Sequence, residues 1–218
     1  MSKKVAVILA GSGVFDGSEI HEAVITLLAL ERAGADVQCF APDVPQLHVI
    51  NHLTGEVMEG EQRNVLTESA RIARGAVRDL KEASAADFDA VVIPGGFGVA
   101  KNLSDFALKG PEMSVNADLL ALAKAFHAAG KPVGLMCIAP ALAAAIFGEG
   151  VQCTIGTDAG TAAALTTMGA SHQEADVSSI VVDSGNKLVT TPAYMLAGNI
   201  AEAASGIEKL VAEIVAMA

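Results

Sequence analysis

Aromatic and basic residues are scarce in this sequence. It has no tryptophan, one tyrosine and only 4% aromatic residues, which leaves little for stacking on bases or sugars. Fourteen Lys and Arg residues stand against 25 Asp and Glu residues, and the formal net charge is −11. Because nucleic acids and anionic membranes attract basic surfaces, we expect neither as a partner.

A hydrophobic run long enough to span a bilayer is also missing, although the mean hydropathy is +0.46. The longest uncharged stretch, from Pro132 to Gly148, contains Gly134 and Pro140 and falls short of the ~20 apolar residues that a span requires. We interpret this stretch as buried core. The 218 residues are enough for one globular domain with a large core, over residues 1–218.

The sequence has few cysteines, and their number and spacing give no sign of disulfide pairing. The three cysteines are odd in number and form no C-x-x-C motif, which excludes a disulfide framework and fits a reducing compartment. The first residues run directly into an apolar strand and leave no room for a secretory signal. We therefore predict a cytoplasmic protein.

Apolar runs alternate with amphipathic segments along the whole chain. The pattern predicts an α/β fold with a doubly wound, mostly parallel sheet sandwiched by helices. Parallel strands are expected at 5–10, 36–41, 88–94 and 132–136, a short strand at 151–155 and a hairpin at 180–191. Helices are expected at 18–34, 63–74, 115–130, 157–168 and 197–216.

The segment 42–62 interrupts this alternation and has no firm helical period. We interpret it as an inserted loop that forms a lid or an oligomer contact. It carries His48 and His52 four residues apart, but no third ligand is evident, so we predict no metal. The high apolar content favours a homodimer or higher homo-oligomer.

The first strand is followed by Gly11-Ser12-Gly13, which invites a dinucleotide interpretation. The G-x-G-x-x-G fingerprint requires a third glycine where this chain has Asp16. The motif therefore gives little support for a nucleotide cofactor, and we predict none.

Cys137 lies where an apolar strand turns into an Ala/Leu-rich helix. Unpaired N–H groups and the positive end of a helix favour a thiolate there, as in a nucleophile elbow. The alternative is a small buried hydrophobic residue, as most free cysteines are. The Gly95-Gly96 pair after the preceding parallel strand supports the nucleophile, because such glycines let N–H groups approach a reacting centre.

Acidic residues stand in the first turns of the first helix, at the carboxyl edge of the sheet where ligands bind in this class of fold. Glu19 is explained by the helix dipole alone. The helix dipole explains Glu22 less well, because Glu22 lies one turn further into the helix, among apolar neighbours.

These features together resemble the PfpI-like branch of the class I glutamine amidotransferase-like superfamily, whose fold is flavodoxin-like. Within it, the chain is similar to the ElbB group, the enhancing-lycopene or isoprenoid-biosynthesis proteins. The resemblance covers essentially the whole chain and rests on the segments 16–23, 49–56, 94–98, 100–104, 134–140 and 189–196.

The resemblance implies roles for individual residues. Cys137 is the nucleophile, and Glu22 is its partner because it lies 12 residues before Gly34; Glu19 is the reserve choice. Gly96 and Ile138 supply N–H groups to an oxyanion. Gly95 and Asp158 are expected as neighbours of the substrate.

One departure limits the choice of reaction. Many relatives place a histidine after the strand that follows the elbow helix, and this chain reads Thr154-Ile155-Gly156-Thr157-Asp158 there. A Cys-His-Glu triad for amide hydrolysis is therefore disfavoured. The resemblance implies a cofactor-free, glutathione-independent glyoxalase that converts glyoxal, a small 2-oxoaldehyde, to glycolate. The alternatives are a non-catalytic redox sensor that uses an oxidisable cysteine, or an amidase or deglycase of the same superfamily.

Overall fold

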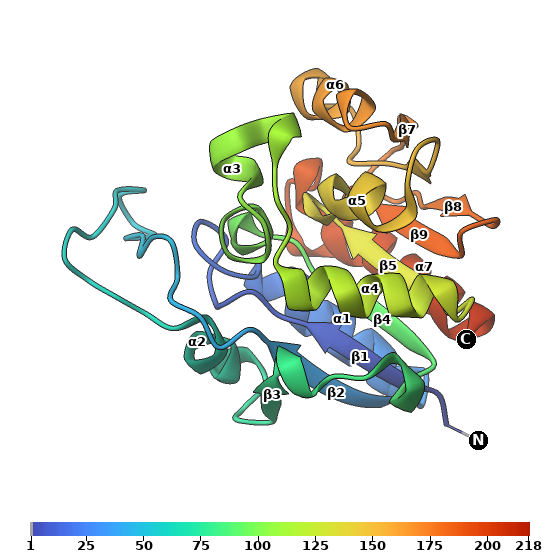
Figure 1. Ribbon diagram of the computed structural model, residues 1–218, viewed down its shortest axis with the longest axis horizontal. Helices are drawn as coiled ribbons and strands as arrows, with labels where there is room; N and C mark the ends of the chain where they lie inside the picture. Colours follow the sequence, from blue (N-terminus) through green and yellow to red (C-terminus); the bar gives the residue numbers. More distant parts are fainter. Residues whose placement is uncertain (1) are drawn as a thin grey trace.

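The apolar runs of the sequence become neighbouring strands of one sheet in the computed structural model, which describes residues 2–218 (Figure 1). The seven strands follow the order β3-β2-β1-β4-β5-β9-β8. All neighbours are parallel except β8 and β9, which form the expected hairpin. The strands are β1 Lys4–Ile8, β2 Asp36–Ala41, β3 Val77–Asp79, β4 Ala90–Ile93, β5 Val133–Met136, β8 Val181–Asp183 and β9 Leu188–Thr191.

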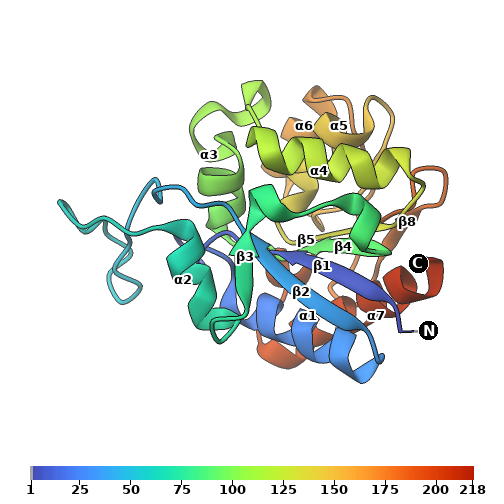
Figure 2. The same ribbon diagram turned by 60° about the horizontal axis from the view of Figure 1, so that its bottom comes forward.

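Helices cover both faces of the sheet, as a doubly wound fold requires (Figure 2). One face is covered by α1 and α7, and the other by α4, α5 and α6. The helices are α1 Ile20–Arg32, α2 Val65–Ile72, α3 Phe106–Lys109, α4 Ala117–Ala128, α5 Ala143–Phe147, α6 Ala159–Thr167 and α7 Ile200–Met217. This confirms the predicted fold class.

The core is split by the sheet, because successive side chains of a strand point to opposite faces. In β1, Ala6 and Ile8 pack with Phe126 of α4, whereas Val5 and Val7 pack with Leu30 of α1. Both sets are fully buried. The continuous apolar runs of the central strands therefore reflect burial on both faces.

Several elements were not predicted. The strand β3 has only three residues, none of them fully buried, and so leaves no apolar run in the sequence. The strand expected at 151–155 is shorter, β6 Gln152–Cys153, and pairs with β7 Ser171–His172 in a separate two-stranded sheet. Helix α1 begins later than predicted, because the Glu19 side chain caps it.

The loop from 42 to 64 projects from one side of the sheet in both views (Figures 1 and 2). The loop is anchored within its first half at Ile50, whose N–H donates to the Asp16 carboxylate at 2.7 Å. The His52 ring accepts a hydrogen bond from the Phe15 N–H at 3.2 Å. The loop therefore packs on the turn that follows β1.

No helix among residues 2–218 has both the length and the apolar character needed to cross a bilayer.

The strand order reverses between β1 and β4, since the chain proceeds from β1 toward β3 on one side and from β4 toward β8 on the other. Ligands of doubly wound folds bind at this switch point, beyond the carboxyl ends of the strands. The turns after β1, β4 and β5 all meet there.

Candidate active site

Cys137 follows the last residue of β5 and has a strained backbone. Its φ is +58°, a left-handed conformation that is uncommon for residues other than glycine. Its own N–H donates to the Thr191 carbonyl at 3.0 Å, which ties the turn to the end of β9. The residue is only 7% exposed. A cysteine with a strained backbone at the end of a strand is the geometry expected of a nucleophile elbow.

Backbone donors surround the Cys137 sulfur. The N–H groups of Gly96 and Ile138 both hydrogen-bond to it. Gly96 has a φ of +95°, and a Cβ there would lie 2.3 Å from the Glu19 nitrogen. Glycine is therefore required at Gly96 both for its backbone conformation and for the close approach.

Glu22 is fully buried and in contact with Cys137. Its carboxyl oxygens accept hydrogen bonds from the N–H of Gly95 at 2.9 Å and the N–H of Tyr194 at 3.1 Å, and its side chain also hydrogen-bonds to Cys137. Burial raises the pKa of Glu22 to about 7, an effect that the nearby Glu19 carboxylate reinforces and the two N–H donors oppose. A carboxyl group with this pKa exchanges protons near neutral pH.

The thiol pKa differs from the sequence prediction. Burial, and next the charge of Glu22, raise the pKa of Cys137 well above its usual value. The expected helix dipole is weak, because a 3₁₀ turn, Ala139–Leu142, follows the elbow and α5 adds only five residues. The Cys137 thiol and Glu22 therefore form a coupled pair in which Glu22 loses its proton at a lower pH than the thiol.

A cavity of about 490 Å³ opens at the sulfur. Cys137, Gly96 and Ile138 line it, and Glu22, which hydrogen-bonds to Cys137, is not among the lining residues. Loop 42–62 contributes none of the lining residues within the described chain, so the structure does not show it as a lid. The oligomer contact proposed for this loop stays a prediction.

Tyr194 is a site residue that sequence reasoning missed. It lines the cavity, and its hydroxyl group hydrogen-bonds with His21 Nδ1 at 2.8 Å. His21 Nδ1 lies 4.0 Å from Glu19. The position of Tyr194 after β9, at the same edge of the sheet as Cys137, was the available signal.

The remaining predicted residues differ in their positions. Gly95 is at the centre, because a Cβ there would lie 2.4 Å from Cys137 Cβ and 2.7 Å from the Glu22 carboxyl. Glu19 lies one turn away and accepts a hydrogen bond from the Glu22 N–H. Asp158 is exposed, accepts from the Thr161 N–H as the cap of α6, and is not among the residues that line the cavity.

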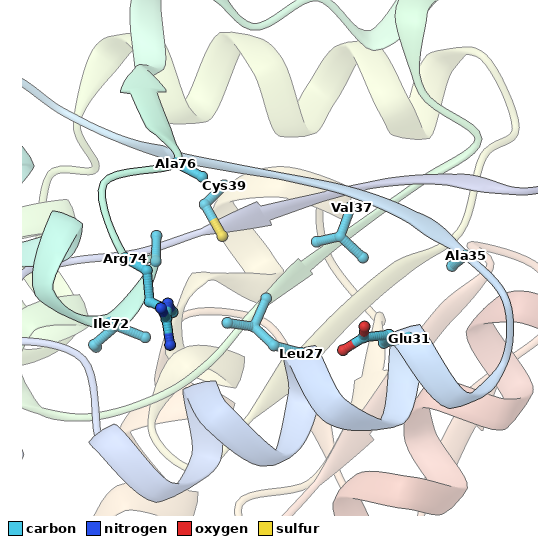
Figure 3. Close-up of a pocket in the computed structure, with 9 residues that line it drawn as sticks. Leu27, Glu31, Ala35, Val37, Cys39, Ile72, Arg74 and Ala76 are labelled. Atoms are coloured by element: carbon cyan, nitrogen blue, oxygen red, sulfur yellow. The ribbon is translucent and has the colours of Figure 1, made fainter.

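The other two cysteines lack such surroundings. Cys39 lies in a separate groove between α1 and β2, with Leu27, Glu31 and Arg74 around it (Figure 3). Burial raises its pKa to about 11, and burial raises the pKa of Cys153 to about 12. Neither pKa is affected by a hydrogen bond from a backbone N–H group, unlike that of Cys137.

Metal ligands are not grouped in the part of the chain that the structure describes. No three His, Cys, Asp or Glu side chains among residues 2–218 come together as a metal ion would require.

The chain is similar to a human protein, glutamine amidotransferase-like class 1 domain-containing protein 3, mitochondrial. The two are 54% identical over 201 residues, which cover 88% of this chain and 75% of the human protein. A rat relative, the ES1 protein homolog, mitochondrial, is 49% identical over 97% of this chain and 82% of its own. The mitochondrial names overturn the predicted cytoplasmic location. That prediction used the cysteines and the absence of a secretory signal, which do not distinguish these compartments.

Similarity extends to a solved structure and to a family model. The isoprenoid biosynthesis protein with amidotransferase-like domain from Ehrlichia chaffeensis has a TM-score of 0.93 and 37% identity, over 99% of both chains. The model of the DJ-1/PfpI family matches residues 3–200. With a doubly wound fold and a cysteine elbow, this protein belongs to the DJ-1/PfpI family of the class I glutamine amidotransferase-like superfamily.

Proposed function

We propose that the protein is a cofactor-free, glutathione-independent glyoxalase that converts glyoxal to glycolate. The observation that carries the proposal is Glu22, a buried carboxyl group with a pKa of about 7 that hydrogen-bonds to the Cys137 thiol beside a cavity. The superfamily includes enzymes with a cysteine nucleophile.

The first step is addition of the thiol to one aldehyde carbon. Glu22 takes the thiol proton as the sulfur forms its bond to carbon, and the carbonyl π electrons move to oxygen. The N–H groups of Gly96 and Ile138 already point at the sulfur and stabilise that oxygen. Glu22 then passes this proton to the oxygen, which gives a hemithioacetal on Cys137 and restores the Glu22 carboxylate.

The second step moves a proton between neighbouring carbons. The Glu22 carboxylate accepts the proton from the carbon bound to sulfur and returns it to the next carbon. The proton of the hemithioacetal hydroxyl group passes to the oxygen of that next carbon, so the first carbon becomes a thioester carbonyl and the second an alcohol. This oxidises the first carbon and reduces the second, so the step needs no external oxidant. Water then hydrolyses the thioester and releases glycolate and the free thiol.

The identity of the base favours this reaction over amide hydrolysis. The Cys137 sulfur is hydrogen-bonded to a carboxyl group, and its other partners are backbone N–H groups. Expelling an amine requires a general acid such as an imidazolium, whereas an aldehyde has no leaving group. The raised thiol pKa also counts against a peroxide sensor, which requires a ready thiolate.

Glycolate formation from glyoxal tests the proposal, with metal-free protein and no glutathione. We expect Cys137→Ala to abolish turnover and Glu22→Gln to lower it at least ~100-fold. Cys39→Ala removes a thiol outside the site and serves as the matched control. If the folded parent protein makes no glycolate but releases ammonia from glutamine, the glyoxalase proposal is wrong and the protein is an amidase.

A further inference from the structure

The last step of the proposed reaction, hydrolysis of the thioester on Cys137, requires a base for the attacking water. The cavity of about 490 Å³ opens at the sulfur and is the space from which water reaches the thioester. Glu22 is not among the residues that line this cavity, and its carboxyl oxygens already accept the N–H groups of Gly95 and Tyr194. We therefore looked for the base among the polar side chains of the cavity wall.

Two hydroxyl groups line the cavity in the part of the chain that the structure describes, those of Thr161 and Tyr194. The Thr161 side chain hydrogen-bonds to Asp158, an exposed carboxylate whose pKa is lowered by this bond and by the Thr161 N–H. A carboxylate with a lowered pKa is a weak base. The Tyr194 hydroxyl group is hydrogen-bonded at 2.8 Å to Nδ1 of His21, and an imidazole is the commonest general base in enzymes.

Tyr194 cannot act as a base by itself. Burial, and next the charges of Glu19 and Glu22, raise the pKa of Tyr194 above its usual value, so the hydroxyl group keeps its proton at neutral pH. It accepts a proton from water only if it passes its own proton to a second group. His21 Nδ1 receives that proton in the tautomer that carries its hydrogen on Nε2.

The surroundings of His21 suit a group that gains a proton and then releases it. The Glu19 carboxylate lies 4.0 Å from His21 Nδ1, the nitrogen that receives the proton, and its charge stabilises the imidazolium. Glu19 is held in place because it also caps α1 through the Glu22 N–H. The His21 side chain is 48% exposed, so the imidazolium can lose its proton directly to solvent.

We propose that Tyr194 is the general base for thioester hydrolysis and that His21 takes the tyrosine proton. This inference rests on the proposed function and extends it to the step that frees the product. Tyr194 accepts a proton from water as its own proton passes to His21 Nδ1, and the water oxygen bonds to the thioester carbon. The C–S bond then breaks and its electron pair goes to sulfur. The second proton of the water moves from the new carboxyl group to that sulfur, so glycolate and the thiol are formed and His21 releases one proton to solvent.

Two substitutions remove the proton transfer and keep the packing. Tyr194→Phe retains the ring and the backbone N–H that donates to Glu22. His21→Asn places an amide oxygen close to the position of Nδ1, which accepts the tyrosine hydroxyl group but does not take up its proton. We expect kcat for glyoxal to fall at least ~10-fold in both variants, while the thioester accumulates on Cys137 and is trapped by hydroxylamine. The value of kcat/KM should stay within about 3-fold of that of the parent, because it reports only the steps up to the thioester.

Deacylation measured without an aldehyde separates this inference from the proposed function. Cys137 is acetylated with p-nitrophenyl acetate, the reagent is removed, and loss of the acetyl group from the Cys137 peptide is followed by mass spectrometry. We expect Tyr194→Phe and His21→Ala to slow this loss at least ~100-fold. Free imidazole should restore the rate of His21→Ala, since that side chain is half exposed. The matched control is His127→Asn on α4, where the ring packs on Phe147, and it should deacylate at the rate of the parent.

The outcomes distinguish the two proposals. If the protein turns over no aldehyde but Tyr194→Phe and His21→Ala deacylate slowly, the roles of Tyr194 and His21 stand and the glyoxalase is rejected. If glycolate forms and Tyr194→Phe deacylates as fast as the parent, the glyoxalase stands and this inference is overturned. An equal loss of rate in Thr161→Val would overturn the choice of Tyr194, and a His21→Ala variant that imidazole does not restore would overturn the role of His21.

Discussion

The reactivity of Cys137 should rise with pH through the pKa of Glu22. Below about pH 7 both members of the pair are protonated, and the thiol has no base. Loss of one proton gives the carboxylate that accepts the thiol proton. The second proton is lost only far higher, because the pKa of Cys137 is raised well above its usual value.

The magnitude follows from the pKa of about 7. At pH 5 only ~1% of Glu22 is ionised, so both kcat/KM and the rate of Cys137 alkylation should be ~100-fold below their values on the plateau above pH 8. The plateau should extend to at least about pH 9, because the thiol itself does not ionise there.

The assay is alkylation by iodoacetamide from pH 5 to pH 9, with Cys137 followed by mass spectrometry, beside kcat/KM for aldehyde. Alkylation does not depend on the identity of the substrate. In Glu22→Gln the rise near pH 7 should disappear, since the amide has no proton to lose in this range. A rate that is constant from pH 5 to pH 8, or the same midpoint in Glu22→Gln, would refute the coupling.

Three further predictions concern stability and assembly. Because the pKa of Glu22 is raised from 4.5 to about 7, the native state binds the carboxyl proton more tightly than the unfolded state does. The unfolding free energy of the parent should therefore fall by ~3 kcal/mol between about pH 4.5 and pH 7, relative to that of Glu22→Gln. Urea denaturation at a series of pH values measures this loss. Gly95→Ala should lower the unfolding free energy by ~1–3 kcal/mol and remove most of the Cys137 reactivity, because the added Cβ would clash with both Cys137 and Glu22. Gly160→Ala is the control, since its Cβ would have no neighbour within 3.5 Å, and it should change neither quantity. Val24 and Leu28 lie four residues apart on α1, and their side chains are 47% and 42% exposed. Replacing both by Glu should convert the expected homo-oligomer to a monomer, as measured by light scattering. An unchanged molecular mass would contradict this prediction.

The sequence predicts the elements whose signals are local. The strand expected at 36–41 has the bounds of β2, and the helix expected at 157–168 is α6, Ala159–Thr167. Cys137 and the Gly95-Gly96 pair were placed at one edge of the sheet because parallel strands end together, and their strands β4 and β5 are neighbours.

What sequence reasoning missed depends on contacts between distant segments. Tyr194 meets His21 across 173 residues, and no local pattern signals that pairing. The thiol pKa was predicted in the wrong direction, because the helix after the elbow is short and burial of Cys137 exceeds its effect. Burial is set by the packing of the whole chain and cannot be assigned from a motif.

The left-handed backbone of Cys137 implies that the chemistry of the thiol is gained at the expense of the stability of the fold. At a φ of +58°, glycine would be accommodated without strain, so Cys137→Gly should melt at a higher temperature than the parent, while Cys137→Ala retains the strain. Selection for stability alone would therefore favour glycine at this position. That a thiol stands there instead indicates that the chain is kept less stable than it could be for the sake of its chemistry.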